Sequence, residues 1–234
     1  MGIKNNIIYK IEKVKNLEQW AKIVNKKQWK DGKSAKEFAK YMLSNGGYLP
    51  PEIEEIIGKC PKNMEAITYP EKVTSFGKGF GRGHGRQHDA LIISEDFVIG
   101  VEAKVDEPLG KSMGECDNEN KEIRIKALSR YLYGDENKAK ELKIKYQLLS
   151  ASVGTLMEAE RNNKKKSVLL FIIFNNEETD NMRENKKAIE DFIKSLKNGE
   201  NSAKKFGEDK DITFNVSTIE IKIPKVKYQS DIFL

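Results

Sequence analysis

The sequence predicts an α/β fold in which helices flank a central β-sheet. Two short apolar runs, Ala90–Ile93 and Phe97–Val101, read as a β-hairpin. The segment Ser167–Phe174 (SVLLFIIF) is an uninterrupted apolar run, which is typical of a strand covered on both faces. Amphipathic helical segments precede, separate and follow these strands. Because 234 residues suit one domain of ordinary size, we expect a single domain.

The N-terminal segment, residues 1–50, predicts a mainly helical extension. Ile7–Val14 alternates loosely and suits a short strand. Asn16 is a suitable N-cap for an amphipathic helix. Ser34 and Glu37 have the spacing of a capping box at the start of a second helix.

The rest of the chain predicts further helices and strands around the hairpin. Proline and glycine mark several of their ends. In order, these elements are a helix from Pro51 to Gly58, extended pieces at Glu65–Tyr69 and Val73–Phe76, a helix closed at Gly134, a longer helix from Asn137 to Arg161 with a buried stripe that begins at Leu142, the strand Ser167–Phe174, a helix over Met182–Leu196, and an edge strand over Ile212–Ile223.

The end of the hairpin concentrates charge. If the turn is Glu95-Asp96, Ile92 faces Ile99 and Asp89 faces Glu102. Lys104 is two residues beyond Glu102 and shares its face. Two carboxylates in a partly buried place need a cation, a shared proton or hydrogen-bond donors. A divalent metal meets this need; alternatively, Lys104 neutralises one carboxylate and the other reaches solvent.

The pattern of Asp89, twelve residues, and then Glu102-Ala103-Lys104 resembles the PD-(D/E)XK nuclease superfamily, although His88 stands where that family name has Pro. The resemblance implies a restriction-endonuclease-like core with a mixed sheet over residues 51–174. The helical segment 1–50 and the helix and edge strand of 175–234 are then additions. It also implies that Asp89, Glu102 and the Ala103 carbonyl hold Mg²⁺ or Mn²⁺, while Lys104 orients the attacking water.

The resemblance implies two more candidate positions. Several branches of the superfamily place a Gln near the active site, on the helix after the E-x-K strand, and Gln147 matches loosely; a surface Gln is the alternative. Some members take a further acidic ligand from an earlier helix. Glu37 is one candidate, with helix capping as its alternative duty. Further candidates are Glu52, Glu54 and Glu55.

A glycine-rich stretch leads into Asp89. Glycines at 77, 79, 81, 83 and 85 alternate with Lys78, Phe80, Arg82, His84 and Arg86. In an extended conformation the large side chains share one side. Cations interleaved with an aromatic suit phosphates and an unstacked base, so Lys78, Arg82 and Arg86 are candidate nucleic-acid contacts. A flexible loop with incidental charges is the alternative. If the strand begins as early as His88, that side chain points to the face opposite Asp89.

Composition narrows the class of protein. The net charge of +6 favours an anionic partner, but 36 acids among 42 bases exclude a uniformly basic surface. Two cysteines, Cys60 and Cys116, do not make a disulfide framework. No signal peptide or membrane span is apparent, which predicts a cytoplasmic protein. The abundance of Lys, Asn and Ile suggests a bacterial source.

The leading functional hypothesis is therefore a Mg²⁺-dependent nuclease that acts on DNA, or less favourably on RNA. The first alternative is a non-catalytic member of the same fold that binds nucleic acid or protein. The second is a metal-dependent hydrolase of a small phosphorylated compound. A homodimer is left open.

Overall fold

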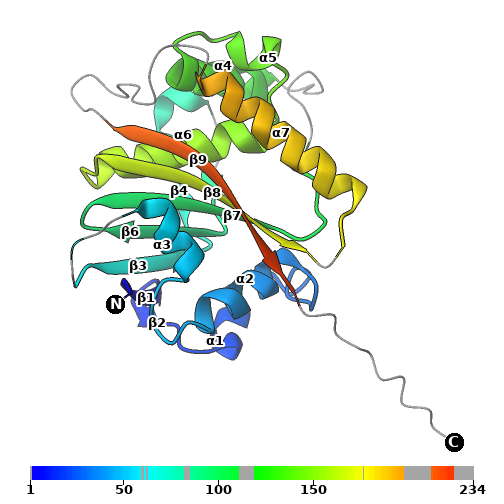
Figure 1. The fold of residues 1–234 in the computed structure, drawn as a ribbon. Coiled ribbons are helices and arrows are strands. Elements are labelled where there is room, and N and C mark those ends of the chain that lie inside the picture. The colour runs from blue at the N-terminus through cyan, green and yellow to red at the C-terminus, as the bar shows by residue number, and fades with distance from the viewer. Residues whose placement is uncertain are drawn as a thin grey trace, which may run out of the picture.

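A seven-stranded mixed sheet forms the centre of the molecule, with helices on both of its faces (Figure 1). The computed structural model describes residues 2–58, 61, 63–81, 85–110, 119–175, 177–197 and 212–223. The predicted α/β class is confirmed.

The sheet includes strands from both ends of the chain. Neighbours pair in parallel for β1–β3, β7–β8 and β8–β9, and antiparallel for β2–β1, β3–β6 and β6–β7. In spatial order the strands are β2 (Glu12–Lys13), β1 (Lys4–Tyr9), β3 (Glu65–Pro70), β6 (Ala90–Ser94), β7 (Phe97–Lys104), β8 (Lys166–Asn175) and β9 (Thr213–Lys222). A second, two-stranded sheet pairs β4 (Val73–Thr74) with β5 (Arg86–Gln87).

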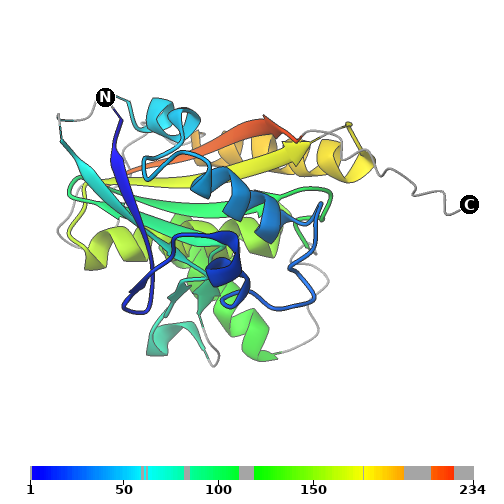
Figure 2. The same ribbon diagram turned by 90° about the horizontal axis from the view of Figure 1, so that it is seen from below.

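The helices form two layers, and one of them lies in front of the sheet in the view of Figure 2. That layer is α1 (Leu17–Ala21), α2 (Ser34–Leu43) and α3 (Pro51–Ile57). The other layer is α4 (Glu119–Tyr133), α5 (Lys138–Glu141), α6 (Tyr146–Arg161) and α7 (Asp180–Lys197), and a 3₁₀ turn, η1 (Lys78–Phe80), packs beside α4. Each layer encloses its own buried apolar cluster against the sheet.

Strand β7 contributes to both clusters because its side chains alternate. Ile99, Val101 and Ala103 belong to the cluster under α1–α3, and Val98 belongs to the one under α6. Glu102 is therefore on the α6 side. The helix comes very close to the strand there, since a Cβ on Gly100 would lie 2.0 Å from Thr155 Oγ1.

Several sequence predictions are confirmed. The hairpin pairs Ile92 with Ile99, so the turn lies where the sequence placed it. Asn16 caps α1, since its Oδ1 accepts a hydrogen bond of 2.9 Å from the Gln19 amide. Strand β8 is buried along nearly its whole length, and β9 forms an edge of the sheet.

Three local predictions are wrong. The predicted helix from 137 to 161 is broken into α5 and α6, because Lys143 adopts a left-handed φ of 52° and Leu142 turns outward, 40% exposed. Ser34 does not cap α2. Instead, Glu37 accepts a hydrogen bond of 2.9 Å from the Gly32 amide. The strand predicted over 7–14 is two strands, because the chain turns at Lys10, where φ is 57°.

Candidate active site

The charged end of the hairpin contains an irregularity that the sequence did not indicate. Ala90 pairs with Val101, and the Asp89 amide also donates to the Val101 carbonyl at 3.1 Å. Two residues of one strand thus meet one residue of the other, which is the pattern of a β-bulge. The regular pairing stops one step before the expected opposition of Asp89 and Glu102. Asp89 still lies at the Glu-Ala-Lys segment, because its Oδ2 accepts a 2.7 Å hydrogen bond from the Ala103 amide.

Glu102 is surrounded by donors. It is 1% exposed. Arg86 donates to both of its oxygens, with Nε 3.2 Å from Oε1, and Gln147 Nε2 donates to Oε2 at 2.8 Å. Burial alone would raise the pKa of Glu102, but the Arg86 guanidinium outweighs it and holds the pKa at about 2. The Glu102 carboxylate is therefore ionised, and the Arg86 guanidinium neutralises its charge inside the protein.

His88 is also in this cluster: β6 begins only at Ala90, so the opposite face expected for a strand that includes His88 does not apply. It is fully buried, and its Nδ1 lies 3.3 Å from Glu102 Oε1. Within the described residues neither ring nitrogen has a hydrogen-bond partner, so this contact is close but poorly aligned. Burial lowers the pKa of His88, so the ring is neutral. Its other side packs on α6, where a Cβ on Gly154 would lie 2.7 Å from Nε2.

Asp89 has a contrasting environment. Burial and the nearby charge of Glu102 raise the pKa of Asp89 to about 6, although Lys104 opposes this. Glu71 lies beside it, and its amide donates to the Asp89 carbonyl at 3.0 Å. Burial and the Asp89 charge raise the pKa of Glu71 to about 7. Two carboxylates that repel each other therefore share this part of the site.

The sequence analysis missed Glu71. It follows Pro70 in a turn with a left-handed φ of 52°, and the pairing of β3 with β6 brings it to Asp89. A Glu in a Pro-containing turn gives no signal of such a position. The acids considered instead lie elsewhere: Glu52 accepts from the Tyr41 hydroxyl, and Glu54 accepts from the Ile3 amide.

A polar cavity of about 940 Å³ connects these groups. Lys104 lines it and, within the described residues, forms no ion pair. The opposite wall comes from the connection between α1 and α2. The lining residues are Ile23, Val24, Asn25, Lys27, Gln28, Lys33, Ser34, Ala35, Glu71, Arg86, Gln87, Asp89, Glu102, Lys104, Glu107 and Gln147.

Of the three candidate nucleic-acid contacts, the structure describes Lys78 and Arg86 and places them apart. Arg86 is drawn into the cavity wall by Glu102, and Lys78 is exposed in η1, away from the cavity lining. Arg82 and His84 lie outside the described residues. The extended alternation is wrong at 78–80, where the chain forms a 3₁₀ turn and Phe80 packs on Phe76 with ring centroids 5.6 Å apart.

The cavity has the donor chemistry for a divalent metal but not the arrangement of ligands that it requires. Carboxylate oxygens are the ligands that Mg²⁺ prefers, and Asp89, Glu71 and Glu102 supply them in one cavity. However, no cluster of three or more His, Cys, Asp or Glu side chains in the described part of the chain is arranged to hold a metal. The reason lies at Glu102, whose oxygens face Arg86, Gln147 and His88.

Comparisons with known proteins place the chain in a family. Among the described helices, none combines the length and the apolar character needed to cross a membrane. No curated protein and no solved structure matches the chain. The profile of DUF6946, a domain of unknown function, matches residues 13–222, so the chain belongs to this family.

Proposed function

We propose that this protein is a divalent-metal-dependent nuclease that hydrolyses phosphodiester bonds of DNA, and of RNA less readily. The observation that carries the proposal is one cavity lined by Asp89, Glu102, Lys104 and Gln147 at the end of the β6–β7 hairpin. The strand order β3-β6-β7-β8, with three antiparallel strands and a parallel fourth, supports the likeness to a nuclease-like core.

The donor set fits Mg²⁺ or Mn²⁺ in its chemistry. Asp89 and Glu71 repel each other and are poorly compensated, so a cation between them relieves an existing cost. Glu102 is the third acid. When bound, the metal would supply positive charge to the scissile phosphate and lower the pKa of a water molecule.

Lys104 is the group assigned to the reacting phosphate. Arg86 already neutralises Glu102, so Lys104 is not needed as the counter-ion of that carboxylate. Its ammonium lines the cavity and, among the described residues, makes no ion pair. A positioned cation that stabilises charge developing on the phosphate is worth about 10²–10³ in rate.

Arg86 controls access to Glu102. A carboxylate has about four lone-pair positions. Arg86 occupies two of them, Gln147 one more, and His88 lies against the remaining side. A metal ion can therefore bind Glu102 only if one of these side chains moves away. We assign that role to Arg86, because a freed guanidinium in the cavity can then donate to a phosphate oxygen.

The same ion pair favours a second candidate function, a non-catalytic nucleic-acid-binding protein. With Arg86 in place, Glu102 is satisfied without metal, as expected of a site that has kept its acid only for structure. The two functions differ in a measurable way, since only the nuclease gains metal affinity when Arg86 is removed.

The direct test is cleavage of plasmid DNA, single-stranded DNA and RNA in Mg²⁺ or Mn²⁺, with EDTA as the blank. Wild type, Asp89→Asn and Lys104→Ala are compared with Lys140→Ala, an exposed lysine on α5. The proposal expects metal-dependent cleavage by wild type and Lys140→Ala alone. Wild type that binds DNA but cleaves no substrate in either metal would favour the binding protein.

A further inference from the structure

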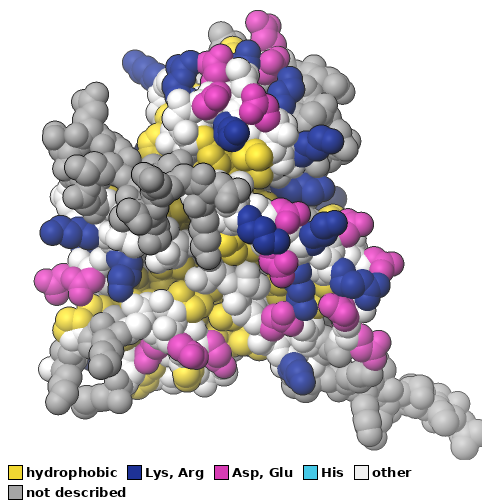
Figure 3. All heavy atoms as spheres, turned by 45° about the horizontal axis from the view of Figure 1, so that its top comes forward, with side chains coloured by type: hydrophobic (Ala, Val, Ile, Leu, Met, Phe, Trp, Pro, Cys, Tyr) yellow, Lys and Arg dark blue, Asp and Glu magenta, His cyan; other side chains and the backbone are white. Residues whose placement is uncertain are grey.

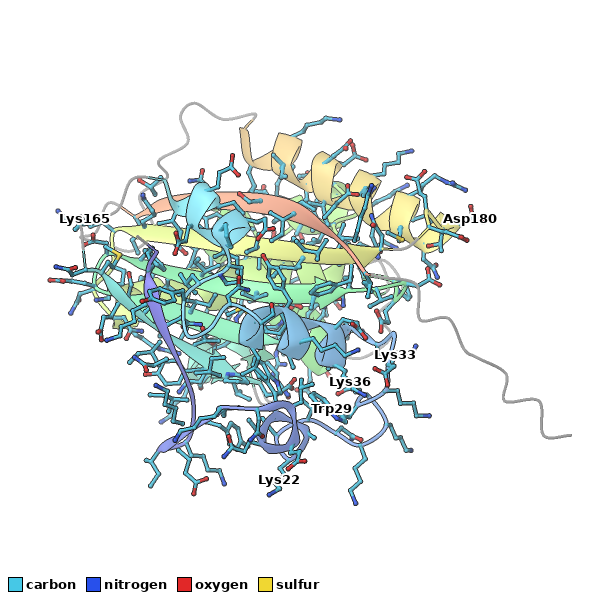
Figure 4. The ribbon with its side chains drawn as sticks, turned by 60° about the horizontal axis from the view of Figure 1, so that its bottom comes forward. Lys22, Trp29, Lys33, Lys36, Lys165 and Asp180 are labelled. Carbon is cyan, nitrogen blue, oxygen red and sulfur yellow. The ribbon has the colours of Figure 1, made fainter. Side chains whose placement is uncertain are left out.

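The cavity has two walls of different character. The sheet wall holds the acids with Arg86 and Lys104, and the facing wall comes from residues 23–28 and 33–35. Lys27 and Lys33 are the cations of that facing wall. Figure 4 shows Lys22, Trp29, Lys33 and Lys36 together around α1, α2 and their connection. Glu71, Asp89 and Glu102 are thus on the sheet wall, whereas the facing wall carries lysines and meets one carboxylate, Glu107, which accepts a hydrogen bond of 3.5 Å from the Ser34 amide.

The charge of this segment is unusually one-sided. Residues 22–36 contain six lysines and one acid, Asp31. That acid pairs with Lys36 and with Lys40, each at 2.7 Å. Of these six lysines, the five that form no ion pair with any described residue are Lys22, Lys26, Lys27, Lys30 and Lys33. By contrast, the face in Figure 3 mixes cations with anions, and Arg183 and Lys186 on α7 pair with acids.

The backbone that carries these lysines is anchored. Trp20 and Val24 are buried in the cluster under α1–α3, and Trp29 packs partly against it. Turn hydrogen bonds, including Gln28 N to Asn25 O at 2.8 Å and Lys33 N to Lys30 O at 3.1 Å, hold the connection. Cations on a preorganised backbone lose less conformational entropy when an anion binds.

We propose that the segment 25–33, the lysine wall, binds the phosphate backbone of a nucleic-acid strand and holds it in the cavity against Lys104. This inference rests on the proposed nuclease function and names the surface that receives its substrate. Ser34 and Ala35, the first residues of α2, line the same wall, but the Glu107 carboxylate already accepts a hydrogen bond from the Ser34 amide, so the attraction for phosphate comes from the lysines and not from the end of the helix. The wall takes the role that the sequence suggested for the glycine-rich stretch.

The test is equilibrium binding of fluorescently labelled DNA, single-stranded and duplex, and of RNA of the same sequence. Ca²⁺ replaces Mg²⁺, and Kd is measured as a function of salt. The variant is Lys27→Gln with Lys33→Gln. The matched control is Lys140→Gln with Lys187→Gln, which removes two exposed lysines from helices outside the cavity. Each lost phosphate contact reduces the slope of log K against log salt by roughly 0.7–0.9.

We expect a smaller slope and weaker binding for the lysine-wall variant, and wild-type behaviour for the control. Equal slopes in wild type and both variants, with cleavage retained by wild type, would overturn the lysine wall and leave the nuclease proposal standing. Wild type that neither binds nor cleaves any of the nucleic acids would overturn both. Comparison of the DNA and RNA arms shows which strand the wall accepts.

Discussion

The two acidic regions of the cavity are balanced in different ways. Glu102 is held at a pKa of about 2 by Arg86, despite its burial. In the neighbouring region, burial and the charge of Glu102 raise the pKa of Asp89 to about 6, and burial and the charge of Asp89 raise the pKa of Glu71 to about 7. Glu102 is paired with a cation, whereas Asp89 and Glu71 form no ion pair among the described residues, although Lys104 partly opposes the rise at Asp89. This difference indicates that an added cation would be stabilised most beside Asp89 and Glu71. To bind Glu102 as well, it would have to displace Arg86.

Substitution of Arg86, the cation paired with Glu102, is expected to have the largest effect on folding stability. Arg86→Ala leaves Glu102 as an unpaired buried carboxylate, which costs about 3–5 kcal/mol of folding stability. Because Glu102 is then available to bind a metal, Mn²⁺ should raise the melting temperature of Arg86→Ala more than that of wild type. Thermal melts with EDTA and with Mn²⁺ measure both effects.

The control for that experiment is Arg130→Ala. Arg130 pairs with Glu136, but its side chain is 68% exposed. Exposed ion pairs contribute about 0–1 kcal/mol, so this variant should melt close to wild type. An Arg86→Ala protein as stable as Arg130→Ala, with no gain from Mn²⁺, would contradict the assignment of Arg86.

Lys104→Ala leaves both acidic regions intact and removes only the cation assigned to the phosphate. Cleavage should fall by about 10²–10³, which corresponds to the loss of one positioned electrostatic group. Metal binding should remain, because Asp89, Glu71 and Glu102 are unchanged. Rates and melting temperatures on one preparation separate catalysis from stability; a stable variant with full activity would exclude the role.

Gly154→Ala disturbs the packing behind Glu102. The new methyl group would lie 2.7 Å from His88 Nε2 and 3.2 Å from Arg86 Cβ. Overpacking of this kind costs about 1–3 kcal/mol. Gly79→Ala is the matched control, since its Cβ meets nothing within 4 Å. Urea unfolding compares the two, and equal midpoints would mean that His88 and Arg86 can move freely.

Asp89 and Glu71 should make the folding stability decrease as the pH rises. The folded-state pKa values of Asp89 and Glu71 lie above their ordinary values of 3.8 and 4.5, so both groups favour folding in their protonated form. Their contribution is present below about pH 4 and is lost as pH rises to about 7, by at most about 1.4 kcal/mol per pH unit for each group.

Glu71→Gln should flatten this dependence, because the amide does not titrate. Saturating Mn²⁺ should flatten it in wild type as well. Urea unfolding across this pH range provides the measurement. Identical pH profiles for wild type and Glu71→Gln would show that folding does not raise the pKa of Glu71.

Much of the fold follows from local sequence pattern. The hairpin register came from turn chemistry and alternation, and β8 was recognised from its apolar run; both are confirmed. The break between α5 and α6 was missed because Lys143 in a left-handed conformation carries no local signal. An apolar periodicity that continues past a break looks the same as one helix.

The part of the site that the sequence predicted is mainly the part formed by residues close together in the chain. Asp89, Glu102 and Lys104 lie within one hairpin, and Gln147 reaches them from α6. The bulge at Asp89 depends on one backbone hydrogen bond, and it accompanies the unforeseen approach of His88 to Glu102. Glu71 and the lysine wall reach the cavity through the pairing of β3 with β6 and the packing of the α1–α2 connection, which single-sequence patterns do not encode.

The most direct test of the central claim is calorimetric titration of Mn²⁺ into wild type and into Asp89→Asn, at a pH above 7 so that the carboxylates are ionised. We expect wild type to bind Mn²⁺ in the cavity and Asp89→Asn to lose that site while remaining folded. Identical titrations of the two proteins, or no heat of binding in wild type, would contradict a metal centre at Asp89.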